Sequence, residues 1–592
     1  MTLRIESITP KIGDRLTLGQ LSILVGPNNS GKSQTLRDIR EYITTGSDAK
    51  LVAIRGLELR MVDMPNALRG LTRRPHPNPV HEHIFGVASD LQKRHETTPT
   101  YAWMKTTFDG APDNANVSEE VLRSFGPFWL AHLDAEGRFH LAAATDSYHT
   151  REESPANALQ AFFGEGRAAV EELRAAFREA FAVDIALDWA AMKKLGLVIG
   201  EDFGVIPDTR EGLDVLLRDA LALEKQGDGY RSFAGVVLAM LTFPDRVLLL
   251  DEPEAFLHPA QARVLGRWIA RACCKRGAQV LISSHSADFL HGVVSANAEA
   301  TVVRLNRTSS GSTFHLVPAE TTAGLIRSPL LSSQPVMDAL FHRGVVVCEG
   351  DPDRAIYQTI AHTMLSGEGG EDILFIHSNG KDAAKGPIEL LRSAGAPVCA
   401  ALDIDVINSP NVLTDVCTAL RATPPSAHIL KARQNVAAHV EEIDESQRIA
   451  QIEAALQEWL QTTHTDLRRA RKSLEQIAGE GSKWDQVKKL GVDYFSGDSR
   501  REIDQLLSDL VALGLFLVPC GELESWMKNL GFSKGSKWNR AALEALSQDQ
   551  CPAPLREYVR SLITFLSKDY SRNGGAGDAD AQSPTSALTV QG

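Results

Sequence analysis

Cysteine pairs with CxxC spacing are missing from this sequence. The chain holds seven cysteines in 592 residues, and no two of them form a CxxC pair. That spacing predicts neither a zinc site nor a disulfide framework. Several of the cysteines lie inside apolar runs, where the residue behaves as a small buried hydrophobe. We therefore expect free thiols in a reducing compartment and a cytoplasmic protein.

A membrane-spanning apolar run and an excess of positive charge are missing as well. No run approaches the roughly 20 apolar residues that a membrane span needs. The opening MTLRIESITP has no apolar secretory core. These absences exclude a membrane transporter and predict no membrane partner. The formal net charge of −13 argues against a protein that coats DNA by bulk charge, although it leaves room for a local basic groove.

The order of apolar runs and helical spacings predicts an α/β protein with two main domains. At 592 residues the chain exceeds one ordinary domain. Buried runs alternate with helical stretches on both sides of a Ser/Thr/Pro-rich connector at 308–335, as in parallel sheets with crossover helices. The expected units are a domain at 1–330 with a partly helical insertion at about 56–184, a domain at 336–530 with a helical insertion at about 426–509, a helical segment at 531–572, and a disordered tail at 573–592 that is rich in Gly, Ala, Asp and Ser.

A glycine-rich loop, GPNNSGKS, follows the apolar run Leu21–Val25 and precedes a stretch with helical spacing. In a phosphate-binding loop the backbone amides cradle the phosphates. Lys32 is expected to reach the β- and γ-phosphates, and Ser33 to hold Mg²⁺. The sequence therefore predicts an ATP site, and its expected nucleotide-binding residues are Gly26, Pro27, Asn28, Asn29, Ser30, Gly31, Lys32 and Ser33.

The segment LLLDEPEAFLHP supplies the expected partner of that loop. Asp251 ends an apolar strand and is predicted to bind nucleotide through Mg²⁺ and water. Glu252 next to it is predicted to polarise the attacking water as a general base. The segment SSHS ends the next apolar run, so His285 is predicted to contact the γ-phosphate.

These residues resemble the ABC-type ATPases, in particular the soluble branch shared with SMC and RecF-like proteins. The resemblance covers about the first 330 residues apart from the insertion. It implies that a signature loop from a second ATPase head completes the site, so the active unit is at least a dimer. The matching segment is QGDGYRS, in which Gly227 and Gly229 open a helix whose N-terminus can receive a γ-phosphate. This segment departs from the usual LSGGQ-like consensus sequence, and no glutamine of the Q-loop is identified.

Downstream, the segments VVVCEGDPD and ALDIDVI each place acids at the end of an apolar strand. The first contributes Glu349 and Asp353, and the second contributes Asp403 and Asp405. Alternate residues of a strand share a face, so we expect both aspartates to turn toward one ion. Clustered carboxylates suit Mg²⁺ or Mn²⁺. Two such ions can activate the nucleophile and stabilise the leaving oxygen of a phosphodiester.

The acidic segments resemble the Toprim domain of topoisomerases, primases and some nucleases. The resemblance assigns Glu349 to the catalytic glutamate of the first motif and Asp403 and Asp405 to the DxD pair. Asp353 matches the additional acid of the nuclease branch. The turn SNGK at 378–381 matches the glycine-containing turn after the second strand.

An ABC-type ATPase followed by Toprim resembles the OLD (overcoming lysogenisation defect) family of ATP-dependent nucleases. The resemblance implies a further metal-binding glutamate, for which Glu524 is favoured over Glu522. It also implies a lysine that steadies the transition-state phosphate, either Lys534 or Lys537. The implied activity is an ATP-regulated, Mg²⁺- or Mn²⁺-dependent endonuclease that cleaves DNA in bacterial anti-phage defence, as a homodimer or higher oligomer.

Two other functions stay open from the sequence. One is a Toprim ribonuclease that acts on tRNA, because nothing in the acidic cluster distinguishes the sugars. The other is an ATPase sensor that signals with a partner defence protein or RNA. A topoisomerase would need a nucleophilic tyrosine, and none of the eight tyrosines has a recognisable context. The missing zinc-binding cysteines argue against a primase, and the direction of ATP control is left undecided.

Overall fold

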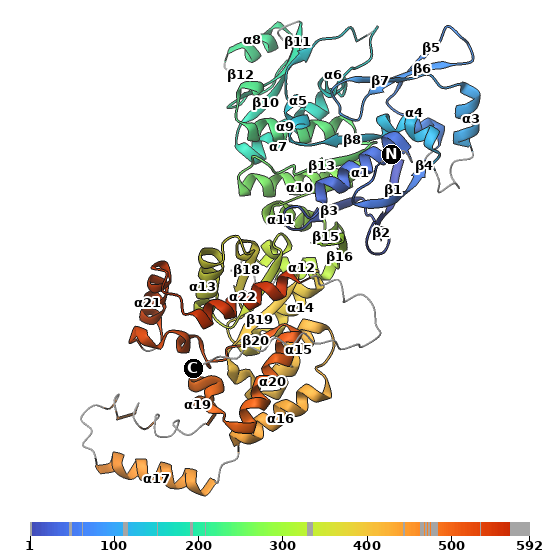
Figure 1. The fold of residues 1–592 in the computed structure, drawn as a ribbon. Helices are drawn as coiled ribbons and strands as arrows, with labels where there is room; N and C mark the ends of the chain where they lie inside the picture. The colour runs from blue at the N-terminus through green and yellow to red at the C-terminus, as the bar shows by residue number, and fades with distance from the viewer. Residues whose placement is uncertain are drawn as a thin grey trace.

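The chain forms two lobes in the computed structural model, joined where β15 and β16 meet α12 (Figure 1). The structure describes residues 3–568 apart from 47–49, 62, 110–116, 151, 190–192, 208, 219, 328–335, 442–444, 533 and most of 462–482. The tail predicted to be disordered at 573–592 lies outside the described residues. We refer to residues 3–327 as the N-terminal lobe and to residues 336–568 as the C-terminal lobe.

A six-stranded sheet is the core of the N-terminal lobe, with the order β16-β15-β3-β14-β13-β8. Neighbouring strands are parallel except for β16, which pairs antiparallel with β15. The central strands are buried along almost their whole length, as continuous apolar runs predict for a parallel sheet covered on both faces. The strands are β3 (Leu21–Val25), β8 (Leu130–Leu133), β13 (Val247–Asp251), β14 (Gln279–Ser283), β15 (Thr301–Thr308) and β16 (Gly311–Val317).

Helices of the N-terminal lobe pack around this sheet (Figure 1). In α9, every residue from Ser232 to Thr242 is buried, so this helix lies inside the lobe rather than on its surface. The helices here are α1 (Lys32–Thr45), α9 (Asp228–Thr242), α10 (Pro259–Arg276), α11 (Ala287–Ala296) and α12 (Ala319–Arg327).

The expected insertion at 56–184 is interrupted in the structure, because β8 lies within it and forms the edge of the core sheet. The rest of the insertion contains strands as well as helices. Three small antiparallel sheets and helices α2 to α8 lie in and around it, with β1 and β2 before residue 56 and β11, α8 and β12 after residue 184. The strands are β1 (Leu3–Pro10), β2 (Leu16–Thr17), β4 (Ile54–Met61), β5 (Thr72–Pro75), β6 (Glu82–Val87), β7 (Arg94–Thr97), β9 (Thr145–Asp146), β10 (Asp184–Asp188), β11 (Lys194–Gly200) and β12 (Leu221–Ala222). The helices are α2 (Met64–Ala67), α3 (Tyr101–Asp109), α4 (Glu119–Trp129), α5 (Ala135–Leu141), α6 (Ala158–Gly164), α7 (Arg167–Phe181) and α8 (Arg210–Arg218).

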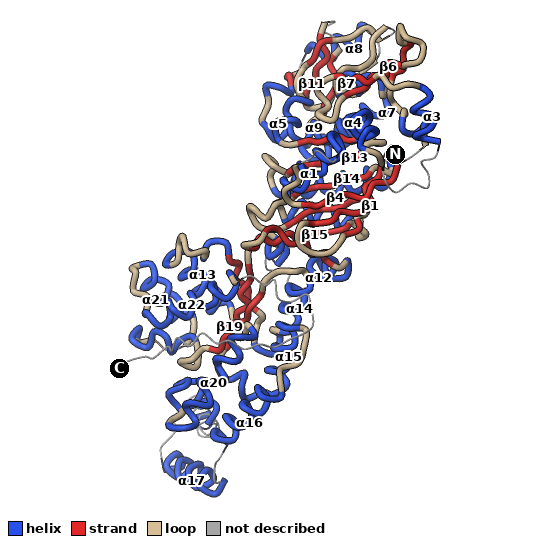
Figure 2. Tube along the Cα trace, turned by 45° about the vertical axis from the view of Figure 1, so that its right-hand side comes forward, coloured by secondary structure: helices blue, strands red, loops and turns tan. Residues whose placement is uncertain are grey.

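A four-stranded parallel sheet, β18-β17-β19-β20, is the core of the C-terminal lobe. Figure 2 shows it as a group of strands separate from the larger sheet of the other lobe. Its strands are β17 (Gly344–Cys348), β18 (Ile373–His377), β19 (Val398–Leu402) and β20 (Leu515–Leu517). The structure thus confirms an α/β fold, with a mainly parallel sheet in the N-terminal lobe and a parallel sheet in the C-terminal lobe.

The segment between β19 and β20 is helical where the structure describes it. It lies within and just beyond the expected helical insertion at 426–509. The helices of the C-terminal lobe are α13 (Asp351–Thr359), α14 (Lys385–Ser393), α15 (Pro410–Arg421), α16 (Ala427–Glu441), α17 (Glu445–Gln461), α19 (Lys483–Leu490), α20 (Gly497–Leu513), α21 (Ser536–Ser547) and α22 (Ala553–Ser567). Short 3₁₀ segments include η4 (Val336–Leu340), η8 (Ile404–Asn408) and η10 (Leu523–Leu530).

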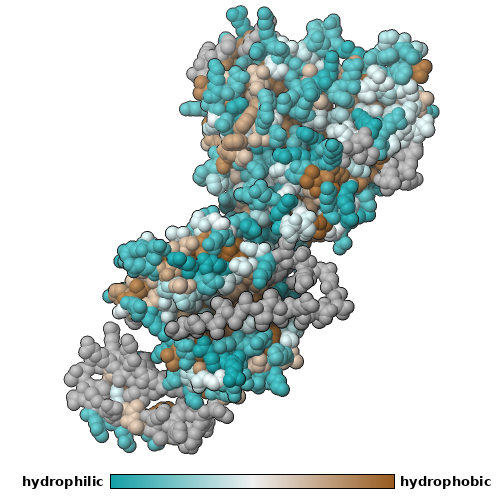
Figure 3. All heavy atoms as spheres, in the orientation of Figure 1, coloured by the Kyte–Doolittle hydropathy of each residue, from teal (hydrophilic) through white to brown (hydrophobic). Residues whose placement is uncertain are grey.

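The outer surface is mainly hydrophilic on the face drawn in Figure 3, with hydrophobic residues in small groups. Within the described part of the chain, every helix is too short or too polar to cross a membrane.

Candidate ATPase and metal sites

The glycine-rich loop connects β3 to α1 and leaves no room for side chains at two of its positions. Gly26 has φ 142° and Gly31 has φ 103°, backbone conformations that L side chains rarely adopt. A Cβ atom on Gly26 would lie 2.3 Å from the Leu305 carbonyl oxygen, and one on Gly31 would lie 2.7 Å from Ser312 Oγ. The loop therefore packs directly against the hairpin formed by β15 and β16.

Lys32 is buried at the start of α1 and points back into the loop. Its Nζ donates hydrogen bonds to the carbonyl oxygens of Gly26, at 2.7 Å, and of Pro27, at 2.9 Å. Burial lowers the pKa of Lys32 to about 8, against the opposing effect of nearby Glu252 and Asp251. A bound phosphate would favour the charged amine, which is the role that the loop motif predicts for this lysine.

Ser33 and Asp251 come together from different elements. Ser33 Oγ, in the first turn of α1, donates to Asp251 Oδ1 at 2.8 Å. Ser283 Oγ at the end of β14 donates to the same carboxylate oxygen. Because β13 and β14 are parallel neighbours, their carboxyl ends meet beside the glycine-rich loop. A hydroxyl and a carboxylate next to a phosphate loop are a donor set that suits Mg²⁺.

Glu252 and His285 form a pair beside this group. Glu252 has φ 49°, which is uncommon for a residue with a side chain. Its carboxylate oxygen lies 2.8 Å from His285 Nε2. The hydrogen bond from His285 lowers the pKa of Glu252 and so keeps the carboxylate ionised. An ionised carboxylate held at the edge of a phosphate site can accept a proton from water.

Arg138 was not singled out by the sequence and lies at the centre of this site. The residue is fully buried. Its Nε donates to Ser232 Oγ at 2.9 Å, and its other nitrogens donate to the carbonyl oxygens of Asp251 at 2.6 Å and Glu252 at 2.9 Å. The arginine therefore ties α9 to the strand end that carries both acids. Since two of its partners are backbone carbonyls distant in sequence, no local motif could have identified it.

Glu254 also lies close to this group and was missed. It is buried and accepts hydrogen bonds from Ser284 Oγ, at 2.7 Å, and from the amide of His285, at 2.8 Å. Burial raises its pKa. This carboxyl group therefore fixes the loop that presents His285.

The segment 226–232, matched to the signature loop, forms the N-terminus of α9. Gly227 is the N-cap residue and is exposed, and a Cβ atom there would meet nothing within 4 Å. Gly229 is enclosed more tightly, because its Cβ atom would lie 2.8 Å from the Phe256 carbonyl oxygen. An exposed helix N-terminus presents backbone amides that favour an anion, here one from outside this lobe.

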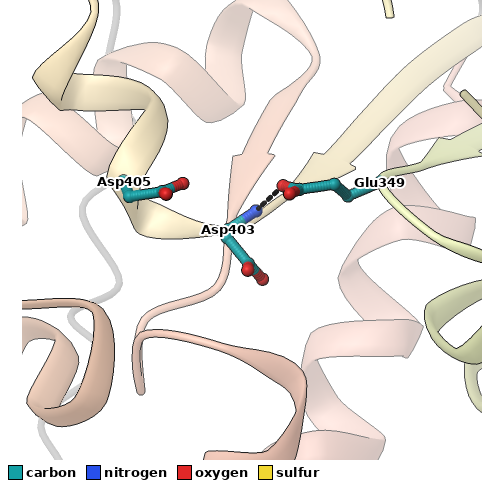
Figure 4. Close-up of side chains that lie close together, drawn as sticks. All are labelled: Glu349, Asp403 and Asp405. Carbon is teal, nitrogen blue, oxygen red and sulfur yellow. Dashed lines mark hydrogen bonds between the residues drawn. The ribbon is translucent and has the colours of Figure 1, made fainter. Parts of the chain in front are cut away.

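In the C-terminal lobe, Glu349, Asp403 and Asp405 form one acidic cluster (Figure 4). Ligand oxygens of all three side chains lie within 4.8 Å of one another. Glu349 follows β17 and Asp403 follows its neighbour β19, so adjacent parallel strands bring these two acids together. The amide of Asp403 donates to Glu349 Oε2 at 3.1 Å, and Asp405 lies on the other side of Asp403.

The expected reason for the position of Asp405 was wrong. We expected Asp403 and Asp405 to alternate along one strand. β19 ends at Leu402, however, and Asp405 lies in the 3₁₀ segment η8. The tight turn after the strand, rather than strand alternation, brings the second carboxylate back toward the first.

The chemistry of this cluster fits a divalent cation. Asp403 is buried, and burial with the nearby charge of Glu349 raises its pKa to about 7. Among the described residues, Asp405 Oδ1 is a buried oxygen that has no hydrogen-bond partner. Crowded carboxylates with an unsatisfied oxygen are stabilised by a cation, and Mg²⁺ and Mn²⁺ prefer such oxygen ligands.

Two lysines face the cluster, and their role was missed. Lys488 of α19 places Nζ 3.0 Å from Asp403 Oδ2 and 3.1 Å from Asp405 Oδ2. Burial by itself lowers the pKa of Lys488, but the two carboxylates outweigh it and raise the pKa. Lys381, which belongs to the SNGK turn, lies 2.9 Å from Asp405 Oδ2. Lys488 lies in the helical insertion, far from every acidic motif in the sequence.

Asp353, Glu522 and Glu524 lie outside the three-residue cluster. Asp353 caps its own helix by accepting from the amide of Gly350 at 3.1 Å. Burial, followed by the charge of Glu349, raises the pKa of Asp353 to about 7, and Glu524 also contributes. Glu524 therefore faces the same region, from the start of η10.

The two candidate lysines differ in their surroundings. Lys534 Nζ lies 3.0 Å from Glu522 Oε2 and 3.6 Å from Glu524 Oε2. Lys537 is exposed in the first turn of α21, and within the described part of the chain it forms no ion pair. Of the pair, Lys534 is the one that the fold brings to the acidic region.

Two family models match the chain. Residues 100–290 match the "AAA domain, putative AbiEii toxin, Type IV TA system", a range that includes Asp251, Glu252 and His285. Residues 340–405 match the "Overcoming lysogenization defect protein-like, TOPRIM domain", which includes the whole acidic cluster. The chain therefore carries an ATPase domain of the AAA/ABC type followed by an OLD-like Toprim domain. This confirms the pair of domains predicted from the sequence.

Solved structures with similar parts include SMC heads and an OLD protein. An SMC head bound to the C-winged helix domain of ScpA is 12% identical, with 54% of this chain and 98% of that chain covered and a TM-score of 0.32. The SMC head domain of Thermotoga maritima is 11% identical, with 54% and 98% covered and a TM-score of 0.28. The C-terminal region of the Xanthomonas campestris pv. campestris OLD protein is 18% identical, with 38% and 95% covered and a TM-score of 0.18. No curated protein matches the sequence. The family models, and not these low TM-scores, support the two domains.

Proposed function

We propose that this protein is an ATP-regulated, divalent-metal-dependent endonuclease that cleaves DNA and acts in bacterial anti-phage defence. The observation that carries the proposal is the cluster of Glu349, Asp403 and Asp405 in an OLD-like Toprim domain. The same chain carries an ATPase domain, so one polypeptide holds both the cutting site and its control.

In the C-terminal lobe, Glu349, Asp403 and Asp405 would hold Mg²⁺ or Mn²⁺. The ion, when bound, would polarise the scissile phosphodiester and activate the attacking water. Asp353 and Glu524, which face the same region, are the residues proposed to support a second ion. Lys534 is largely exposed, and among the described residues its ion-pair partners are Glu522 and Glu524. It can therefore turn toward a phosphate and stabilise its developing charge.

In the N-terminal lobe, the residues around the glycine-rich loop would bind and hydrolyse ATP. Lys32 would exchange its bonds to the Gly26 and Pro27 carbonyls for bonds to the phosphates of ATP. Ser33 and Asp251 would hold Mg²⁺. Glu252, kept ionised by His285, would accept the proton of the attacking water. Phosphodiester cleavage is already downhill, so ATP would control the nuclease rather than drive it.

The test is cleavage of supercoiled plasmid by the purified protein with Mg²⁺ or Mn²⁺, with and without ATP. Asp403→Ala should abolish conversion to nicked or linear DNA, because it removes a buried ligand of the cluster. The matched control is Asp498→Ala, since that aspartate has a side chain that is 87% exposed on α20 and forms an exposed ion pair with Arg501. Plasmid that stays intact with the wild-type protein would overturn the DNA assignment, and labelled tRNA would then be the next substrate.

The defence role has a separate test. Cells that express the wild-type protein should give fewer phage plaques than cells that express Asp403→Ala at the same level. Equal plaque numbers over a broad set of phages would remove the defence role and leave the nuclease assignment standing.

A further inference from the structure

Arg304 crosses the boundary between the two lobes. It lies on β15 of the N-terminal lobe and is fully buried. Its Nε donates to the carbonyl oxygen of Leu340 at 3.2 Å. One terminal nitrogen donates to the Gly395 carbonyl at 2.6 Å, and the other to the His342 carbonyl at 2.7 Å. These three carbonyl acceptors belong to the C-terminal lobe, so one side chain binds two of its segments. Arg304 also donates to Asn306 Oδ1 on its own strand.

Other side chains of the same hairpin reinforce this contact. Asn306 Nδ2 donates to the Gly395 carbonyl at 3.1 Å. His315 Nε2, on β16, lies 2.9 Å from the Ser393 carbonyl oxygen. A Cβ atom on Gly395 would lie 2.4 Å from His315 Cδ2, so the two surfaces cannot slide past each other freely. Figure 1 shows this hairpin between the lobes.

The opposite side of the hairpin touches the glycine-rich loop. Arg304 is the register partner of Val25, the last residue of β3 before Gly26. The next hairpin residue, Leu305, has its carbonyl oxygen against Gly26, and Ser312 lies against Gly31. A change in the loop backbone when nucleotide binds must therefore be accommodated by this hairpin, because the interior is closely packed.

The acceptors of Arg304 lie just before the strands that carry the metal cluster. Leu340 and His342 precede β17, which leads to Glu349. Gly395 precedes β19, which leads to Asp403. Both strands are fully buried, so a displacement at their first residues is transmitted along them. Hydrogen bonds from a charged donor are stronger than those between neutral groups. A buried arginine that lost these bonds would be an unpaired charge, which costs much free energy, so the bonds should persist when the hairpin moves.

We propose that Arg304 is a positioning residue that couples the nucleotide state of the glycine-rich loop to the spacing of Glu349 and Asp403. The inference rests on the proposed function of the two lobes and adds how one controls the other. Binding of ATP draws Lys32 from the Gly26 and Pro27 carbonyls. The loop backbone then changes its contact with the β15–β16 hairpin. Arg304 moves with the hairpin and displaces the first residues of β17 and β19 together.

The test is Arg304→Lys in the full chain. Lysine keeps the charge but has one nitrogen, which cannot serve three separated carbonyls. In the wild type we expect ATP to change the plasmid nicking rate by about fivefold or more, in either direction, as is typical of coupled sites. In the variant that change should fall to about twofold or less, while the nicking rate without ATP and the ATPase kcat and KM stay within about threefold of wild type.

The matched control is Arg246→Lys. Arg246 is also a buried arginine of the N-terminal lobe, and it donates to the carbonyls of Val87 at 2.7 Å and Ala88 at 3.2 Å. Both acceptors lie in its own lobe, so this variant should keep the ATP response. Should Arg304→Lys fail to fold, as judged by its melting temperature, Asn306→Ala is the second variant. It removes one bond to Gly395 and one that Asn306 accepts from Arg304, and it should weaken the response in the same direction.

Hydrogen exchange gives a readout that does not depend on cleavage. Addition of ATP should change the exchange of amides at 344–349 and 398–403 in the wild type but not in Arg304→Lys. An unchanged ATP response in the folded variant, or equal loss in Arg246→Lys, would overturn the inference. A wild type that nicks DNA without any effect of ATP would overturn it too, while the proposed nuclease stands. If the wild type cuts nothing, the proposed nuclease fails and hydrogen exchange still decides the coupling.

Discussion

At the scale of single residues, each site has an acidic group whose charge is influenced by a basic side chain beside it. His285 holds Glu252 in the N-terminal lobe, and Lys488 bridges Asp403 and Asp405 in the C-terminal lobe. In each case the neighbour changes the protonation or the charge of the group that is expected to act. Replacing that neighbour therefore tests the function of the group without removing it.

His285→Ala should shift the pH dependence of ATP hydrolysis. The hydrogen bond from His285 lowers the pKa of Glu252, so in the wild type the base stays ionised below the ordinary range for glutamate. Without that bond the pKa of Glu252 rises, and the acid limb of the kcat profile should move to higher pH. We also expect kcat to fall by about 10- to 100-fold, because the contact predicted between His285 and the γ-phosphate would be lost. The measurement is kcat from pH 4 to 9, in solution.

The control is His291→Ala, a partly buried histidine on α11 whose loss should leave the acid limb in place. An acid limb that stays at the wild-type pH in His285→Ala would mean that Glu252 is not the base.

Lys488→Met should strengthen metal binding. Lys488 supplies a positive charge 3.0 Å and 3.1 Å from two of the proposed ligands, and this charge competes with a cation. Methionine keeps the length of the side chain but removes the charge. We expect Mn²⁺ to bind about tenfold more tightly, as one lost charge–charge repulsion of about 1.4 kcal/mol would give. Calorimetric titration of the full chain measures this, with exposed Lys489→Met as the control. Weaker binding in Lys488→Met would show that the lysine orients the carboxylates instead.

At the scale of elements, the glycine-rich loop lies so close to the β15–β16 hairpin that an added side chain in the loop should lower stability measurably. Gly26→Ala would place a Cβ atom 2.3 Å from the Leu305 carbonyl at φ 142°. Strain of this kind costs about 1–3 kcal/mol, so the N-terminal lobe should melt several degrees lower and bind ATP poorly.

Gly56→Ala is the matched control for that experiment. Gly56 lies in β4, and a Cβ atom there would meet nothing within 4 Å. Thermal unfolding and nucleotide binding of the two variants should separate clearly. Equal stability of both would mean that the loop can move away from the hairpin at little cost.

The elements that could be predicted from sequence were those with a continuous apolar run or a local motif. β17, β18 and β19, with the acids that follow β17 and β19, were recognised in this way. β8 was not, because the four residues LAHL are too short and too polar to stand out from the helices around them. Asp405 was placed near the cluster for the wrong reason, since the sequence does not reveal where a strand ends and a 3₁₀ turn begins.

Arg138, Arg304 and Lys488 could not be found from the sequence by any local signal. Their partners are backbone carbonyls or acids distant along the chain, such as Glu252 for Arg138 and Gly395 for Arg304. Side-chain chemistry marks an arginine as charged and exposed in most proteins. Only the packing of the complete lobes shows which arginines and lysines are buried and which groups they bind.

At the scale of the whole molecule, the exposed N-terminus of α9 predicts an active dimer. Lys32→Ala should remove ATP hydrolysis by disabling the loop. Gly227→Asp should do so by placing a carboxylate where a γ-phosphate from a second copy is expected, although the single head has room for the side chain. Mixed in equal amounts, the two inactive variants should recover about a quarter of the wild-type ATPase, because half of the dimers carry one intact shared site.

Mixing Lys32→Ala with itself is the control for that experiment. A mixture that stays inactive, with heterodimers shown by mass spectrometry, would contradict a shared site. Recovery would establish that two copies meet through the glycine-rich loop of one and α9 of the other.

The order of elements in the C-terminal lobe has a consequence for its biosynthesis. α22 packs on β17 and β19, and residues of β20 pair with β19, yet both come long after those strands in the chain. During translation, Glu349, Asp403 and Asp405 leave the ribosome before Lys488 and Lys534. Until its last helices arrive, the nascent lobe therefore carries an uncovered sheet and an acidic site in which Lys381 is present but Lys488 and Lys534 are not. Chaperones or free Mg²⁺ would protect it during that interval.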